Sequence, residues 1–265
     1  MARNINNSIL ATFRFHGDLI ELLDRSRRKG EYVATISLRS SIKDAVESQG
    51  VPHVEVGLLA VGGMPCGWNP LLEQNEIIDV WGVTDVERVP REWRVDDPDP
   101  HPLRFLLDVH LGRLASYLRL LGFDTLYDSN DPGDDRLAAQ AHDEARILLT
   151  CDRGLLMRNH VRHGRLLRSR NSVEQTREII QRFHLQTRST PFSRCLRCNG
   201  SLSSVDIDTI RDRIPPRVFR RHGANPTRYR ICERCGQLYW EGTHTLRMQR
   251  LLAEWGIPVQ MEPKQ

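Results

Sequence analysis

The sequence predicts a multidomain protein of mixed α/β and α+β class. Over the first 84 residues, strand and helix patterns follow the order β-β-α-β-β. From residue 104 onward, short apolar strands alternate with helices, which is typical of a parallel α/β sheet. Two Cys-x-x-Cys pairs then indicate a small metal-bound module. With 265 residues, of which 39% are hydrophobic, the chain is long enough for more than one core.

The two parts of the chain differ in charge. Residues 1–103 hold 11 Lys+Arg against 16 Asp+Glu, whereas residues 104–265 hold 27 against 18. A basic part favours a polyanionic partner, because neutralised phosphates release counterions on binding. No run of eighteen apolar residues and no apolar signal core are present, so we expect no membrane span, no secretion and a cytoplasmic location.

Alternation predicts the first strand, because Ala11, Phe13 and Phe15 fall on one face. Ser40 or Ser41 can cap a short helix that Gly50 ends. The apolar positions of this helix, which share one face, are Ile42, Ala45 and Val46. The remaining elements of this domain, predicted over residues 1–84, are strands over residues 32–38, 54–61 and 77–83 and a Gly62-Gly63 turn.

Residues 85–103 are charged and rich in proline, which predicts a linker. The second unit begins with a short apolar strand, Arg104 to Leu107, that ends at Asp108. Leucines at helical spacing over residues 111–121 predict the first helix, which Gly122 ends. The later elements are strands over residues 123–127, 147–150 and near Leu166, and helices over residues 135–144, near Leu155 and over residues 172–184.

Carboxylates follow the predicted strands. Asp108 and Asp152 come directly after strands, and the carboxyl ends of parallel strands meet at one edge of a sheet. Asp135 opens the helix before the second of these strands, with Asp131 and Asp134 in the preceding loop. Oxygen ligands of this kind suit Mg²⁺ or Mn²⁺. The alternative is structural: Asp135 is then a helix N-cap, and the other two are ordinary polar residues at strand ends.

The four paired cysteines predict a zinc site. Cys195 and Cys198 form the first pair, Cys232 and Cys235 the second, and 33 residues separate the pairs. Two thiolates from each pair complete a tetrahedron, and a site filled by four protein ligands is structural. The alternative, redox dithiols or free thiols, is disfavoured because neither pair opens a thioredoxin-like helix.

Arginines interleaved with Phe219, His222 and Tyr229 predict binding of single-stranded RNA, with phosphates on guanidinium groups and bases stacked on rings. These arginines are Arg217, Arg220, Arg221, Arg228 and Arg230. Arg113, Arg153 and Arg158 lie beside the predicted carboxylate site and could hold phosphate. The alternative is a set of solvated arginines.

The N-terminal phrases "SIKDAVESQGVPHVEVGLLAVGG" and "NEIIDVWGV" resemble the ubiquitin-like β-grasp proteins of the sulfur-carrier type. Sulfur carriers activate a terminal Gly-Gly, whereas this segment continues through Trp81 and Gly82 into more chain, so we do not expect that chemistry. The resemblance implies a docking domain for a protein partner. A packing accessory that stabilises its neighbour is an equally good interpretation.

The stretch "DDRLAAQAHDEARILLTCDRGLL" resembles the PIN-domain ribonucleases. The stretches "FLLDVHLGRLASYLRLLGFDTLY" and "YWEGTHTLRM" narrow the resemblance to the Mut7-C ribonuclease family. This family implies a PIN-like fold and metal-dependent RNA cleavage, with Asp108, Asp135 and Asp152 as the metal-binding acids. Many PIN nucleases supply a further acid from a helix between the first two, and the helix over residues 111–121 has none.

The resulting prediction is a nuclease core over residues 104–190, a zinc ribbon over residues 191–240 and a helix over residues 241–265 that packs on the core. The favoured function is hydrolysis of RNA with Mg²⁺ or Mn²⁺, the RNA being free tRNA or rRNA or part of the ribosome. The alternative is an RNA- or ribosome-associated adapter that cuts weakly or not at all.

Overall fold

The computed structural model describes residues 8–258 except for residues 224 and 226–228, so the predicted RNA contact at Arg228 lies outside the described residues. The chain forms two compact units. Unit 1 comprises residues 1–102 and 132–167, and unit 2 comprises residues 103–131 and 168–265. Residues 132–167 thus belong to the same compact unit as the N-terminal sheet, whereas the sequence predicts a single domain boundary near residue 103.

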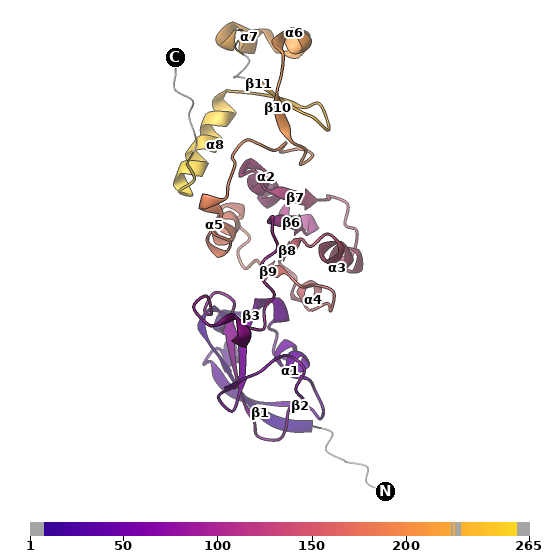
Figure 1. The fold of residues 1–265 in the computed structure, drawn as a ribbon, viewed down its shortest axis with the longest axis vertical. Coiled ribbons are helices and arrows are strands. Elements are labelled where there is room, and N and C mark those ends of the chain that lie inside the picture. Colours follow the sequence, from indigo (N-terminus) through magenta and orange to yellow (C-terminus); the bar gives the residue numbers. More distant parts are fainter. Residues whose placement is uncertain (1–7, 224, 226–228, 259–265) are drawn as a thin grey trace. The chain divides into compact units, whose positions relative to one another are not determined.

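The N-terminal sheet has five strands in the order β2-β1-β5-β3-β4 (Figure 1). Its elements are β1 Ser8–Phe15, β2 Glu31–Ser37, α1 Ile42–Ser48, β3 Val56–Val61, β4 Met64–Pro65 and β5 Ile77–Gly82. Strands β1 and β5 are parallel, and the other pairs are antiparallel. The predicted order is confirmed, with the two-residue strand β4 added to it.

Helix α1 forms as its sequence predicts. The Ser41 side chain accepts a hydrogen bond from the backbone N–H of Asp44 at 3.1 Å, which satisfies one of the donors left open at a helix start. The side chains of Ile42, Ala45 and Val46 are buried on one face. The helix therefore supplies the apolar layer that covers one side of the sheet.

Residues 85–103, predicted as a linker, contact the N-terminal sheet. Val86 is buried, and the backbone N–H of Val95 donates to the carbonyl of Gly57 at 3.0 Å. A Cβ at Gly57 would lie 2.3 Å from the Val86 side chain, so this close approach requires glycine. The Trp68 indole also donates to the Val95 carbonyl, at 3.3 Å. Much of this attachment uses backbone atoms, which composition does not reveal.

The second sheet has the strand order β7-β6-β8-β9, and the pairs β6–β7 and β8–β9 are parallel. Its elements are β6 Arg104–Leu107, α2 Gly112–Leu120, β7 Asp124–Tyr127, α3 Asp134–Asp143, β8 Ile147–Thr150, α4 Arg153–Leu156, β9 Gly164–Leu166 and α5 Ser172–Arg182. The predicted alternation of strands and helices is confirmed.

Aromatic side chains fill the core of unit 2. The ring of Phe105 meets the rings of Phe123 and Phe183 edge-on, with centroids 5.9 and 5.7 Å away. At the C-terminal end of α8 (Thr243–Glu254), the ring of Trp255 lies 5.3 Å from that of Tyr117 on α2. The last helix is therefore attached to the α2 layer.

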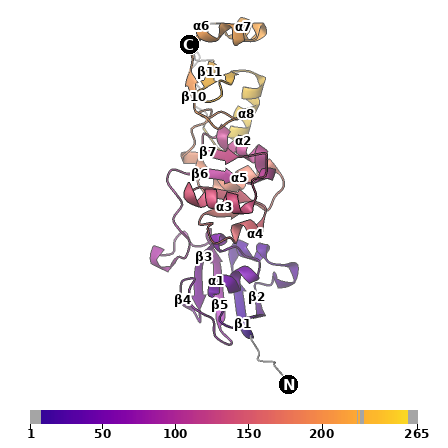
Figure 2. The same ribbon diagram turned by 90° about the vertical axis from the view of Figure 1, so that its right-hand side faces the viewer.

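A third sheet, of three antiparallel strands in the order β10-β11-β12, follows in unit 2. The strands of this sheet are β10 Leu202–Ser204, β11 Tyr229–Cys232 and β12 Leu238–Trp240, and the helices α6 Ile207–Ile210 and α7 Pro216–His222 lie between β10 and β11 in the sequence. Helices α6 and α7 lie together at one end of these strands in both views (Figures 1 and 2). They share a small core with the strands, formed by Ile207, Ile210, Ile214, Tyr229 and Leu238.

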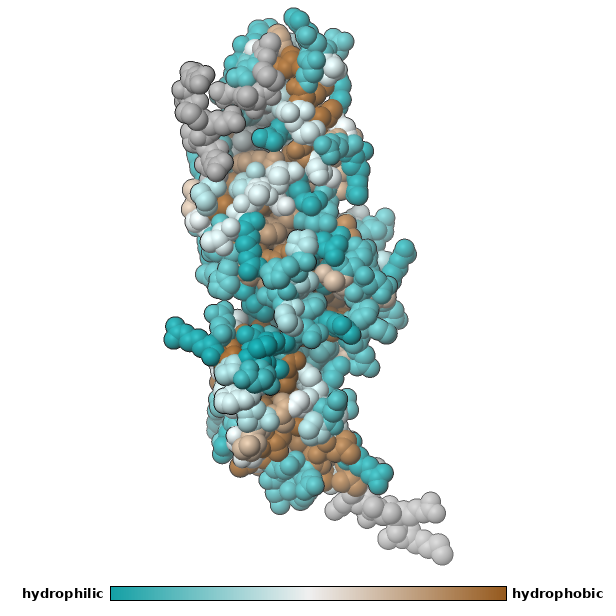
Figure 3. All heavy atoms as spheres, in the orientation of Figure 1, coloured by the Kyte–Doolittle hydropathy of each residue, from teal (hydrophilic) through white to brown (hydrophobic). Residues whose placement is uncertain are grey.

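Apolar side chains are exposed on and near the neighbouring strands β1 and β2 of the N-terminal sheet. Leu10 on β1, Val33 on β2 and Leu38 just after β2 are all exposed, and Figure 3 shows hydrophobic areas over this part of unit 1. Strand β2 is an edge strand. Among the described residues, no helix has the length and apolar character needed to cross a bilayer.

Candidate functional site

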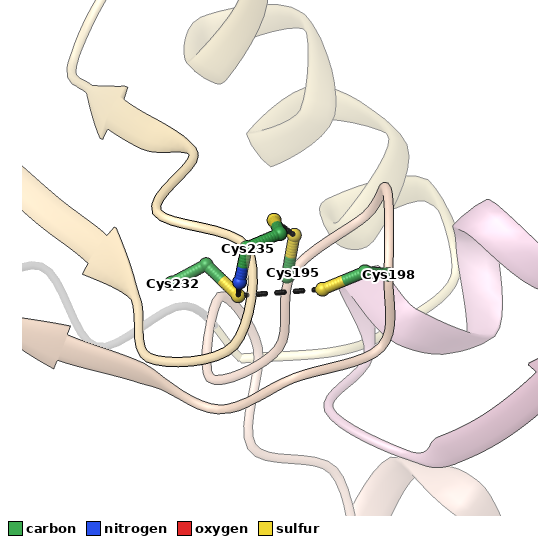
Figure 4. A group of neighbouring side chains, drawn as sticks. All are labelled: Cys195, Cys198, Cys232 and Cys235. Carbon is green, nitrogen blue, oxygen red and sulfur yellow. Dashed lines mark hydrogen bonds between the residues drawn. The ribbon is translucent and has the colours of Figure 1, made fainter.

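The four paired cysteines meet in unit 2 (Figure 4). Their Sγ atoms all lie within 4.8 Å of one another. The Sγ atoms of Cys195 and Cys235 are 3.7 Å apart, and those of Cys198 and Cys232 are 3.4 Å apart. The predicted grouping is confirmed, and the cluster could hold a structural metal ion such as zinc, because four thiolates at this spacing provide a closed tetrahedral site.

The two Cys-x-x-Cys turns have the same backbone hydrogen bonds. The N–H of Cys195 donates to the carbonyl of Gly200 at 2.8 Å, and that of Cys232 donates to the carbonyl of Gln237 at 2.9 Å. In each turn, the residue after the second cysteine donates back to the carbonyl of the first, at 2.9 Å in both cases. The two halves of the site are therefore equivalent turns that present their thiols to a common centre.

The residues after the second cysteine have a left-handed backbone, with φ of 67° at Asn199 and 68° at Gly236. Glycine and asparagine tolerate this conformation best. Gly200 is required for a different reason: a Cβ there would lie 2.9 Å from the Sγ of Cys232 and 3.4 Å from that of Cys198. The space beside the thiols is thus kept open by the missing side chain, which fits a bound metal ion.

The thiols of the cluster differ in acidity. Burial opposes ionisation of Cys195, but hydrogen bonds from Tyr239 and from backbone N–H groups lower its pKa to about 7. Burial, together with hydrogen bonds to the other cysteines, raises the pKa of Cys198 to about 12. The Tyr239 hydroxyl lies 3.1 Å from the Cys195 Sγ and accepts from the N–H of Leu196 at 3.1 Å. A divalent metal ion would offset the charge of the ionised thiolates.

Arg119 of α2 attaches the first cysteine turn to the second sheet's core. Its guanidinium donates to the carbonyls of Leu196 and Arg197 at 3.0 and 3.2 Å, and to the carbonyl of Thr125 at 3.0 Å. Burial lowers the pKa of Arg119. Arg119 was not predicted as part of the site, because a single arginine inside an apolar helix face carries no motif.

Asn199 makes a second attachment. Its side-chain oxygen accepts from the backbone N–H of Thr125 at 2.9 Å, and its amide donates to the Asp124 carboxylate at 2.7 Å. Both partners lie on β7. The first cysteine turn is thereby bonded to the parallel sheet of unit 2, so metal binding and the order of this part of the sheet are expected to be coupled.

Asp152 follows β8 and caps α4. Its carboxylate accepts from the N–H of Gly154 at 2.7 Å, while its own N–H donates to the Thr150 hydroxyl oxygen at 2.9 Å. The side chain is otherwise open, because Asp152 is an exposed residue. A carboxylate has lone pairs for a metal ion in addition to a capping bond, so capping is compatible with the predicted role.

Asp135 is the second residue of α3, and the helix N-cap is Gly133, at φ 81°. The structural alternative that made Asp135 an N-cap is therefore wrong. Its carboxylate, which is 91% exposed, forms an ion pair with Arg158, whose guanidinium also lies 3.4 Å from a carboxylate oxygen of Asp134. Arg158 thus offsets the charge of the two carboxylates.

Asp108 follows β6 and accepts a hydrogen bond from the N–H of Val109 at 2.6 Å. It belongs to unit 2, whereas Asp135 and Asp152 belong to unit 1. That these three residues share one metal ion therefore stays a prediction.

Two family models match the chain, and together they cover most of it. The description "Mut7-C RNAse domain" matches residues 103–252, and "Mut7-C ubiquitin" matches residues 8–86. The chain belongs to the Mut7-C RNAse domain family. The resemblance found in the sequence is thereby confirmed for both parts. No curated protein and no solved structure matches the chain.

The arginines of the Mut7-C RNAse domain differ in their surroundings. Arg113 is exposed, whereas Arg153 is half-buried and donates to the carbonyl of Gly50 at 3.3 Å. Of the arginines between the cysteine pairs that the sequence predicts to bind RNA, those that the structure describes are all exposed; they are Arg217, Arg220, Arg221 and Arg230. Their exposure leaves them accessible to phosphate, and RNA contact there stays a prediction.

The prediction that bases stack on aromatic rings in this region of the Mut7-C RNAse domain is wrong for Tyr229, and for the partly buried Phe219 it stays a prediction. Tyr229 is 1% exposed and lies inside the small core, and Phe219 packs against that core with the Arg211 guanidinium 5.1 Å above its ring. A ribbon of three short strands needs these side chains for its own stability.

Proposed function

We propose that this protein is a divalent-metal-dependent ribonuclease that hydrolyses RNA phosphodiester bonds. The observation that carries the proposal is the match of the Mut7-C RNAse domain to residues 103–252, a range that contains Asp108, Asp135 and Asp152. Asp108 directly follows β6, and Asp152 follows β8 by two residues. Ligands of open α/β sheets bind beyond the carboxyl ends of the strands, which supports these two positions.

In this proposal, Asp108, Asp135 and Asp152 hold Mg²⁺ or Mn²⁺ through carboxylate oxygens. The bound ion would polarise the scissile phosphate and lower the pKa of a water molecule. The carboxylates fix the ion and offset its charge. Asp152 is oriented for this task by its capping bond to Gly154 and by the bond from its N–H to Thr150.

RNA binding is assigned to the exposed arginines. Arg217, Arg220 and Arg221 lie on the short helix α7, and Arg230 lies on β11 beside it in the same small module. Each guanidinium that neutralises a phosphate releases a counterion, which favours binding to RNA of any sequence. The RNA would be tRNA, rRNA or the ribosome itself.

A second candidate function, an RNA- or ribosome-associated adapter, is favoured by two observations. The Asp135 carboxylate is paired with Arg158, so an ion would have to displace an existing partner. The helix over residues 111–121 also lacks the further acid of many PIN nucleases. In the adapter, the arginine surface binds RNA and the carboxylates have structural roles.

Sequencing of RNA crosslinked to the protein, with and without Mn²⁺, distinguishes the two functions. For the ribonuclease, full-length RNA is recovered without metal, and fragments with a common cleaved end appear with Mn²⁺. For the adapter, the same intact RNA is recovered in both conditions. The control is the Asp143→Asn variant, because Asp143 is an exposed carboxylate at the last residue of α3.

A protein partner for the ubiquitin-like module, defined here as residues 8–86, and a cytoplasmic location are further parts of the proposal. The exposed side chains of Leu10, Val33 and Leu38 support a protein contact on β1 and β2. Attachment to a membrane is not part of the proposal.

A further inference from the structure

A buried ion pair joins the ubiquitin-like module to β9. Glu55 is 1% exposed and Arg165 is 6% exposed. One Glu55 carboxylate oxygen pairs with the Arg165 guanidinium, and the other accepts from the backbone N–H of Leu166 at 2.6 Å. The Arg165 guanidinium also lies 3.2 Å from the carboxylate of Asp18. Both oxygens of Glu55 are thus used by a segment more than a hundred residues away in the sequence.

Other contacts hold the same segment along its length. The carbonyl of Gly50 accepts from Arg153 at 3.3 Å. The Lys43 ammonium donates to the side chain of Asn159 at 2.9 Å. Further along, the imidazole of His53 lies 2.8 Å from the carbonyl of Val161. Residues 153–166, which we name the clamped segment, are therefore bonded to the ubiquitin-like module at their start, middle and end.

Close packing accompanies these polar contacts. A Cβ at Gly164 would lie 2.6 Å from the Leu156 side chain and 3.4 Å from that of Val54. Glycine is needed there because the Leu156 side chain of α4 leaves no space for a methyl group, whereas the distance to Val54 is that of an ordinary van der Waals contact. The ubiquitin-like module therefore approaches β9 to van der Waals distance at this position.

A charge buried in this way is held in place, because leaving either partner unpaired in an apolar environment is strongly unfavourable. Release of the module would break this pair together with the bonds from the clamped segment to Gly50, Lys43 and His53. Because all of these contacts would have to be lost together, they favour a permanent attachment over a flexible tether.

We infer that the ubiquitin-like module is permanently attached to the clamped segment, and that Glu55 is a positioning residue for Asp152. The clamped segment begins directly after Asp152, and α4, which Asp152 caps, is its first element. Holding this segment fixes the direction of the Asp152 carboxylate. The catalytic part of this inference rests on the proposed function. These contacts give the module a packing role in addition to the protein contact proposed for β1 and β2.

Hydrogen exchange of the full-length protein tests the attachment without any assay of activity. The variants are Glu55→Gln, Arg165→Met, the double variant, and Glu31→Gln as a control, since Glu31 forms an exposed ion pair with Arg14. Breaking the pair on one side should speed exchange of the Leu166 amide on the order of 100-fold or more. The double variant, with both charges removed, should recover most of the protection.

Two results would overturn the attachment. One is unchanged exchange over the clamped segment in both single variants. The other is an additive effect in the double variant, which would mean that the two side chains do not interact. If Glu55→Gln fails to fold, the Arg165→Met and double variants still report on the pair.

Metal dependence tests the positioning role. In Glu55→Gln, half-maximal cleavage of RNA should require about tenfold more Mn²⁺, with RNA affinity unchanged and the requirement restored in the double variant. An unchanged Mn²⁺ requirement together with faster exchange would refute the positioning role alone. If the wild-type protein cleaves no RNA, the proposed function fails, while the exchange measurement still decides the attachment.

Discussion

Asn199 is predicted to stabilise the first cysteine turn, Cys195 to Gly200, through both its side chain and its backbone. Replacement by Gly removes the bonds to Thr125 and Asp124 but keeps the freedom to adopt φ 67°. The N–H of Thr125, a fully buried residue, then loses its partner, which costs about 1–3 kcal/mol, and the bond to the charged Asp124 contributes about 1.5–3 kcal/mol. The Asn199→Gly variant should therefore lose about 2.5–6 kcal/mol of stability.

Replacement by Ala removes the same bonds and adds the strain of a left-handed backbone, about 1–2 kcal/mol. A variant with Ala is ordinarily more stable than one with Gly at the same position, because Gly loses more conformational freedom on folding. At this position the order should be reversed, with Asn199→Ala the less stable variant.

The assay is unfolding in urea, in which the release of zinc is measured with a chelator that changes colour when it binds zinc. The midpoints should fall in the order wild type, Asn199→Gly, Asn199→Ala. A midpoint for Asn199→Ala at or above that of Asn199→Gly would refute the backbone argument. Wild-type midpoints for both variants would refute the attachment of the cysteine turn to β7.

Three further predictions concern the metal and the RNA surface. Gly200→Ala should weaken zinc binding about 5- to 150-fold, equivalent to about 1–3 kcal/mol of overpacking. The control is Gly242→Ala, which should bind zinc as the wild type does, because a Cβ there would make only ordinary 3.7 Å contacts. Equal zinc affinities of the two variants in a chelator competition would contradict this prediction. The wild-type protein should hold about one zinc ion per chain. The Cys232→Ser variant should lose this ion, and its unit 2 should be less stable. If elemental analysis finds no zinc in wild-type protein that has not been exposed to a chelator, the zinc site is refuted. Reversing the charge at Arg220 and Arg221 should lower the affinity for RNA. It should also reduce the slope of log binding constant against log salt concentration by about 1 per lost phosphate contact. An unchanged slope would mean that these arginines are solvated and do not contact phosphate.

The sequence predicted those elements in which a periodic pattern and a local stop signal agree. Strand β8 begins and ends where its apolar run does, and α1 begins at the predicted cap Ser41. It did not predict the packing of residues 85–103, because that packing depends on backbone bonds such as that from Val95 to Gly57. A polar, proline-rich composition gives no sign of such bonds.

The candidate site shows the same division. Cysteine spacing predicted all four members of the cluster, since each pair is a local motif. Arg119 and Tyr239, which surround the first pair, were not predicted, because Arg119 reaches a carbonyl 77 residues away and the Tyr239 hydroxyl a thiol 44 residues away. The stacking role of Tyr229 was wrong because sequence alone does not distinguish a ring on the surface from one in a small core.

The most direct test of the account is the rate of RNA cleavage by the Asp108→Asn/Asp152→Asn variant in Mn²⁺. An amide still accepts hydrogen bonds but brings no charge to a metal ion, so the fold should survive. We predict cleavage slower than wild type by orders of magnitude, with RNA affinity kept because the arginine surface is unchanged. Cleavage by this variant at the wild-type rate would contradict the carboxylate site.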